Sequence, residues 1–266
     1  MASSARPSDI PQGLSAFAAA AGEGPPPRGG GDTFHLTSSK MLRVDVGTSV
    51  QTKIGSMVAH RGALSFARAS ARKQGVGRMV KKKLTGEGVT LTTVSGRGCV
   101  YLADMGKNII LLKLAAGESL SVSGANVLAF AAEVTWDIKM TKGLGGMASA
   151  GLSNVLLTGP GVVAVTCHGD PLALSVGPGA DVFVDPDAAV AWSGNLKPAL
   201  KTEVSMRGMM GRGSEESIQM AFKSDTPGFV VIQPYEEVEV SSGQGSSKGG
   251  ALGGVFSETL SSLALG

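Results

Sequence analysis

The feature of the sequence that most constrains the fold is an internal repeat, met three times at a spacing of about 60–70 residues. In each copy an alanine precedes a large ring, a small residue stands two positions after the ring, and an apolar residue follows. The three alanine–ring pairs are Ala59-His60, Ala129-Phe130 and Ala191-Trp192. Short runs rich in Val, Leu and Ile flank each pair and end at glycines, a pattern typical of strands joined by tight turns.

The repeats therefore predict an all-β body built from short antiparallel strands. We expect three pseudo-repeats, 33–104, 105–169 and 170–237, that share one core. Their opening strands are predicted at Leu42–Val46, Ile109–Leu114 and Leu172–Val176. Because His60 holds the ring position of Phe130 and Trp192, we expect it to pack in the core rather than to bind a ligand.

Both ends of the chain lie outside this body. Residues 1–32 are rich in Ala, Gly and Pro and are predicted to be a disordered tail, and residues 241–266 begin as a Gly/Ser-rich tail in which Val255–Leu265 favours a short helix. No segment reaches the roughly 18 apolar residues that a membrane-spanning helix needs. The early Asp9 and the lack of a continuous apolar run make the N-terminus a poor signal peptide.

Composition narrows the class of protein. Hydrophobic residues make up 42% of the 266 residues and charged residues 17%, which excludes a highly charged disordered chain. The two cysteines, Cys99 and Cys167, are too few for a disulfide scaffold, so a reducing compartment is expected. The formal net charge of +3 alone does not indicate a nucleic-acid-binding protein.

A basic stretch in the first repeat is the best candidate for a binding site. It contains no acidic residue and seven cations: Arg68, Arg72, Lys73, Arg78, Lys81, Lys82 and Lys83. One face of its second half is apolar at helical spacing. Such a stretch is typical of a solvated surface, of docking on an anionic membrane or partner, or of nucleic-acid binding. RNA-binding modules interleave aromatic residues with cations, whereas only Phe66 lies nearby and is predicted to be core.

Catalytic, metal and cofactor motifs are not evident, so we expect neither an enzyme nor a cofactor. The three histidines lack metal-ligand spacing; His168 and Asp170 follow Cys167 in a predicted loop, but a third ligand is missing. The string Gly143–Ala148 matches a dinucleotide-binding pattern, yet a strand is predicted after it where that fold needs a helix. We interpret it as turn sequence.

Four segments together resemble the altered-inheritance-of-mitochondria 24 family, in particular its bacterial branch: Phe34–Leu42, Gly55–Ala59, Gly211–Glu216 and Gly228–Pro234. The resemblance covers about residues 33–240. It implies a β-sandwich or double-stranded β-helix-like fold, similar to the subunit of the trp RNA-binding attenuation protein. It implies no established reaction and no agreed catalytic residues. The family's yeast namesake is linked to organisation of the mitochondrial inner membrane. The resemblance implies a cytoplasmic protein in a bacterium, or a mitochondrial one in a eukaryote.

Two functions from different classes follow. The first is a non-enzymatic structural or interaction protein, a β scaffold that associates with itself or with a protein partner. The second is an anionic membrane-surface or nucleic-acid binder that uses segment 68–83.

Overall fold

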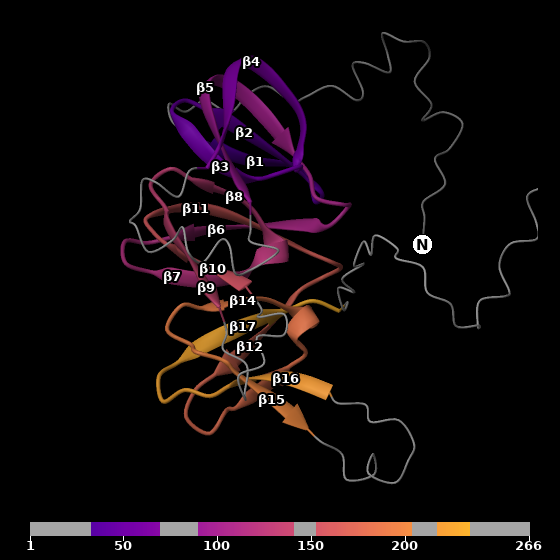
Figure 1. Ribbon diagram of the computed structural model, residues 1–266, viewed down its shortest axis with the longest axis vertical. Helices are drawn as coiled ribbons and strands as arrows, with labels where there is room; N and C mark the ends of the chain where they lie inside the picture. Colours follow the sequence, from indigo (N-terminus) through magenta and orange to yellow (C-terminus); the bar gives the residue numbers. More distant parts are fainter. Residues whose placement is uncertain (1–32, 70–89, 141–152, 204–216, 235–266) are drawn as a thin grey trace, which may run out of the picture.

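The computed structural model describes residues 33–69, 90–140, 153–203 and 217–234. Apart from two short 3₁₀ turns, the regular structure in these residues is entirely strand, which confirms the all-β prediction (Figure 1). The three predicted opening strands are present as β2, β6 and β12, two of them starting one residue earlier than expected. The predicted disordered N-terminal tail, the C-terminal tail with its short helix and string 143–148 lie outside the described residues.

The strands fall into three units that follow one another along the chain. The first unit contains β1 (Thr33–Ser38), β2 (Met41–Val46), β3 (Ser49–Lys53), β4 (Met57–Arg68) and β5 (Leu91–Leu102). The second contains β6 (Asn108–Leu114), β7 (Ser119–Ser123), η3 (Gly124–Asn126), β8 (Val127–Ala131), β9 (Thr135–Met140), β10 (Ser153–Thr158) and β11 (Gly161–Cys167). The third contains β12 (Leu172–Val176), β13 (Val182–Val184), η5 (Pro186–Ala188), β14 (Ala189–Ser193), β15 (Ala199–Glu203), β16 (Ser217–Phe222) and β17 (Gly228–Ile232).

All three units use the same antiparallel pairings. In the second unit β11 lies between β6 and β8, and β10 lies between β7 and β9. In the third unit β17 lies between β12 and β14, and β16 lies between β13 and β15. In the first unit the single long strand β5 takes the place of two strands of the other units. One half of β5 lies between β2 and β4, and the other half lies between β3 and β4.

Two further strand pairs join the units edge to edge. The first strand pair, β3 with β8, connects the first and second units, and β7 with β14 connects the second and third. Figure 1 shows the result, with the first unit at one end of a row, the second in the middle and the third at the other end. The apolar core is accordingly divided into three clusters, not the single shared core that the repeats predict, although two clusters contain residues from neighbouring units.

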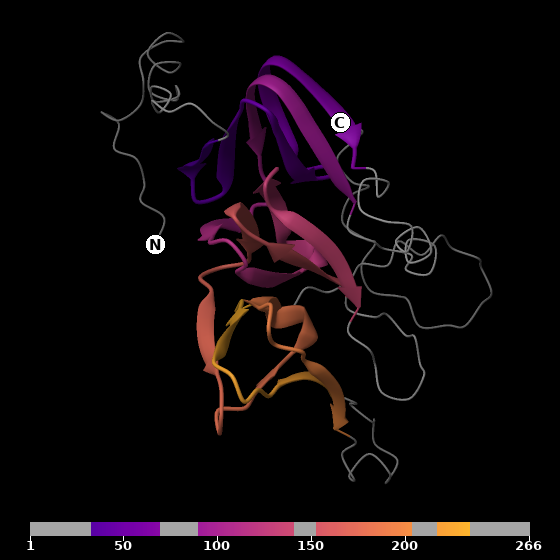
Figure 2. The ribbon, with the colours of Figure 1, turned by 90° about the vertical axis from the view of Figure 1, so that its left-hand side faces the viewer.

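The long strands β4 and β5 form an arch over the first unit (Figure 2). The rings of His60 and Phe66 have centroids 5.3 Å apart, whereas six residues of a straight strand would span roughly 20 Å. The bend lies where Gly62 pairs with Gly98 and where both glycines have positive φ. A side chain at Gly62 would come within 2.6 Å of the Arg97 carbonyl oxygen, so only glycine fits this corner.

The predictions that His60 and Phe66 belong to the core are wrong. His60 is exposed and Phe66 is 39% exposed, whereas Phe130 and Trp192 are buried, with exposed fractions of 0% and 3%. The physical reason is the strand that lies beside each ring-bearing strand. Strands β8 and β14 are each covered on their outer side by a strand of the preceding unit, while β4 has β5 as its single partner among the described strands.

Candidate functional site

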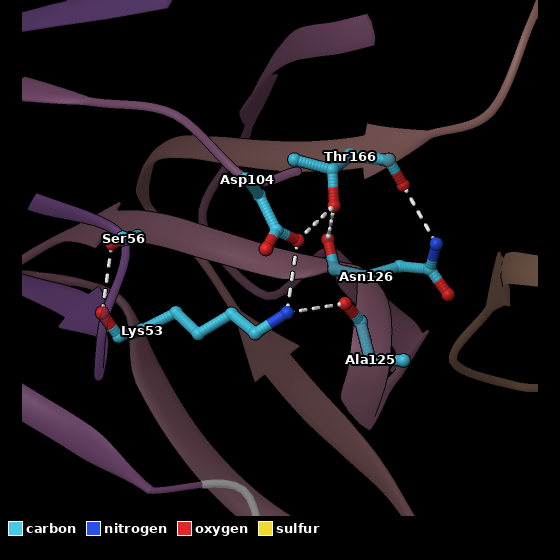
Figure 3. Close-up of polar contacts among 6 residues, drawn as sticks. All are labelled: Lys53, Ser56, Asp104, Ala125, Asn126 and Thr166. Atoms are coloured by element: carbon cyan, nitrogen blue, oxygen red, sulfur yellow. Dashed lines mark hydrogen bonds and ion pairs between the residues drawn. The ribbon is translucent and has the colours of Figure 1, made fainter. Parts of the chain in front are cut away.

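A partly buried polar network crosses the junction between the first and second units (Figure 3). The Lys53 ammonium lies 2.9 Å from Asp104 Oδ2 and donates to the carbonyl oxygen of Ala125, also at 2.9 Å. The Thr166 hydroxyl lies 3.2 Å from the same carboxylate oxygen, and the Asn126 amide donates to the Thr166 carbonyl at 2.8 Å. A charged pair from one unit is thus held by polar groups of the next.

Two turns of the first unit place this ion pair. After β3 the chain turns back at Ser56, whose hydroxyl donates to the Lys53 carbonyl at 2.7 Å. After β5, Lys107 N donates to the Asp104 carbonyl across a tight turn in which Met105 has a φ of 47°. Because a left-handed conformation costs a methionine roughly 1 kcal/mol, the turn is held in place by its surroundings.

The second junction is held by neutral groups instead. The Gln233 side chain accepts a hydrogen bond from His168 N at 3.0 Å and donates to the Asp187 carbonyl at 3.1 Å. Gln233 is only 3% exposed. A side chain that follows β17 therefore ties the third unit to the loop that ends the second.

Sequence reasoning missed both junctions. Lys53 and Asp104 are 51 residues apart, and Gln233 and His168 are 65 apart. No spacing rule connects residues so distant. Only the topology, which brings the ends of β3, β5 and β11 together, reveals the pairs.

The predicted basic site is only partly within the described residues. Arg68 ends β4 and is exposed. The other six predicted cations, Arg72, Lys73, Arg78, Lys81, Lys82 and Lys83, lie outside the described residues. Arg61 and Arg97 are also exposed on the arch, and residues 54–69 and 90–103 contain no Asp or Glu.

The loop with His168 and Asp170 does not form a metal site in the described part of the chain, where no group of three His, Cys, Asp or Glu side chains gathers. Cys167 is fully buried, and this burial raises the pKa of its thiol. The Asp170 carboxylate raises that pKa further, whereas Lys107 acts in the opposite direction. A protonated, buried thiol is a poor nucleophile and a poor metal ligand at neutral pH.

The hollow lined by Asn154, Trp192, Met220 and their neighbours has a volume of only about 10 Å³. That is room for about one water molecule. Within the described ranges, no helix is long and apolar enough to span a membrane.

Two of the strand edges that have no partner strand among the described residues belong to β4 and β13. Strand β4 is twelve residues long, with Met57 46% and Val58 57% exposed. Strand β13, in the third unit, pairs within the described part of the chain with β16, and its central residue Phe183 is 48% exposed. The Lys201 and Lys223 ammonium groups lie 5.0 and 5.7 Å from the centroid of the Phe183 ring.

Comparisons with known proteins agree with the fold. A crystal structure of protein SPYM3_0169 from Streptococcus pyogenes matches with a TM-score of 0.59 and 21% sequence identity, over 77% of this chain and 93% of that chain. At this identity the likeness concerns the fold. No curated protein matches the chain. The family model described as Mitochondrial biogenesis AIM24 matches residues 33–235, three quarters of the sequence, and the chain therefore belongs to the AIM24 family.

Proposed function

We propose that this chain is a non-enzymatic interaction protein, a β scaffold that associates with copies of itself. The observation that carries the proposal is the long outer edge of β4, which no strand in the described part of the chain covers. Proteins usually protect such an edge with lysine, proline or a covering segment, because its free backbone groups pair readily with another strand.

Strand β4 has only part of that protection. It has neither Lys nor Pro over its twelve residues; its charged residues are Arg61 and Arg68, and its pairing with β5 has one bulge, at Met57–Ala59. Four of the five alternate positions from 59 to 67 are small, Ala59, Ala63, Ser65 and Ala67, and the fifth is Arg61. The exposed side chains of Met57, Val58 and Phe66 offer apolar area to bury on association.

Sedimentation velocity of the full chain tests this function. We expect a species heavier than 26.8 kDa at micromolar concentration, dissociating on dilution. Val58→Lys should weaken association because it places a charge at the edge. Leu172→Lys is the matched control, since Leu172 is 56% exposed in a different sheet. A native chain that sediments only as a 26.8 kDa particle contradicts the proposal.

A second candidate function is binding to an anionic membrane surface or nucleic acid through segment 68–83. It is favoured by the exposed cations Arg61, Arg68 and Arg97 and by the absence of acids on the described part of the arch. Replacing Lys81, Lys82 and Lys83 with Ala should then weaken binding to RNA or anionic vesicles and flatten its salt dependence. Binding that does not change with these substitutions excludes this candidate.

A further inference from the structure

The two internal junctions use one pairing pattern in the same register. At the first, Gln51 of β3 lies opposite Phe130 of β8, and Thr52 lies opposite Ala129. At the second, Ser121 of β7 lies opposite Trp192 of β14, and Val122 lies opposite Ala191. In both, the alanine–ring pair of one unit is paired with the short second strand of the unit before it.

The open edges at the two ends of the row are the unused halves of this same junction. The start of β4 contains the alanine–ring pair Ala59-His60 and pairs with β5 as β8 pairs with β11 and β14 with β17. Strand β13 pairs with β16 as β3 pairs with β5 and β7 with β10. Each open edge thus corresponds to one partner in the internal junctions.

We propose that a second copy of the chain docks head to tail, with β13 of one copy pairing antiparallel to the start of β4 of the next. This inference rests on the proposed self-association and adds its interface. Transferring the internal register places Phe183 opposite His60, Val184 opposite Ala59 and Val182 opposite Arg61. The occupant of both edges is therefore another copy.

The side chains at the open ends fit this pairing. Phe183 in β13 occupies the position that Ser121 occupies in β7. Ser121 is 4% exposed, whereas Phe183 is 48% exposed. The ring position that is the buried Phe130 in β8 is the smaller, exposed His60 in β4. In this pairing the large Phe183 ring lies opposite the smaller His60 ring, where the internal junctions place Gln51 or Ser121 opposite a large ring. Cross-strand ring pairs stabilise sheets.

Charge disfavours pairing of two β4 strands. Strand β4 carries Arg61 and Arg68 and no acid, so a β4–β4 pair would bring cations together. Strand β13 is flanked by charges of both signs: Asp181 and Asp185 on either side of it in the sequence, and Lys201 and Lys223 over the Phe183 ring, of which Lys223 is paired with Asp181. The contact joins two different surfaces, so repeating it generates a ring or an open filament. Figure 1 places β4 and β16, the partner of β13, toward opposite ends of the row.

Cysteine cross-linking tests the register. A His60→Cys chain is mixed with a Phe183→Cys chain under mild oxidation, because directly opposed strand residues have Cα atoms about 4.5–5.5 Å apart, within disulfide range. The out-of-register control is Ser65→Cys, also exposed on β4, mixed with the same Phe183→Cys chain. The native chain, whose Cys99 and Cys167 are buried, measures background. We expect at least about tenfold more disulfide-linked dimer from the His60 mixture, because Ser65 lies five positions further along β4, beyond the bend at Gly62, and is not opposite Phe183 in this register.

Hydrogen exchange on the native chain gives a second readout that needs no substitution. Amides of residues 59–61 and 182–184 should both become more protected as concentration rises, because pairing engages both edges. Equal cross-linking of the two mixtures, or no concentration-dependent protection at either edge, overturns the inference. If the native chain nevertheless sediments above 26.8 kDa, the proposed function stands without this interface. A strictly monomeric chain overturns both.

Discussion

The first and second units have the same topology, yet their equivalent strands differ in burial. Phe130 in β8 is completely buried, whereas His60, at the same place in β4, is exposed. The difference does not come from pairing within the unit, which is the same in both. It comes from the adjacent unit, because β3 covers β8 and no strand of the described chain covers β4.

The corners of the two units differ for a related reason. In the second unit the chain breaks between β8 and β9, where Val134 N donates to the Ala131 carbonyl and Val134 itself is buried. In the first unit the same path continues as one strand, bent at Gly62. A continuous, glycine-bent ribbon keeps β4 in place even though only one side of it is paired.

The largest effect that tests this comparison is expected from two substitutions of phenylalanine by alanine. Phe130→Ala should lower the free energy of unfolding by about 4 kcal/mol, because it removes a fully buried ring. Phe66→Ala should cost less than about 1 kcal/mol, because that ring is 39% exposed and contacts His60. Urea unfolding at low protein concentration measures both. Equal losses would mean that the arch is packed as tightly as the second unit.

The rings of Phe66 and His60 also show how far the sequence could predict the structure. The strands of all three units follow from local patterns, β-branched runs that end at glycines, and such patterns are sufficient to place β2, β6 and β12. The burial of Phe66 and His60 could not be predicted in the same way. Repeated residues occupy equivalent positions within a unit, but their exposure depends on whether a strand of a preceding unit lies beside them.

The candidate site shows the same limit. The exposed cation Arg68 was predicted from composition alone, since seven cations without an acid are visible in the sequence. The junction residues Lys53, Asp104 and Gln233 carry no local pattern. Their partners lie across unit boundaries, and only the register of β3 with β8 brings the first pair to Ala125 and Thr166.

The two junctions themselves differ in kind, and a smaller set of substitutions tests that difference. Asp104→Ala leaves the Lys53 ammonium with only the Ala125 carbonyl among these contacts and should cost about 3 kcal/mol, because a partly buried cation loses its counter-charge. Gln233→Ala removes two neutral hydrogen bonds at the second junction and should cost about 1 kcal/mol.

A double-substitution cycle separates the ion pair from the volume that the side chains fill. If the charges act as a pair, Lys53→Met combined with Asp104→Leu should be less destabilising than the sum of the two single changes, because neither charge is then left buried alone. Chemical unfolding of the four chains at one pH gives the coupling free energy. A coupling near zero would show that Lys53 and Asp104 contribute independently, and the first junction would then depend, like the second, on neutral hydrogen bonds and on the strand pairing of β3 with β8.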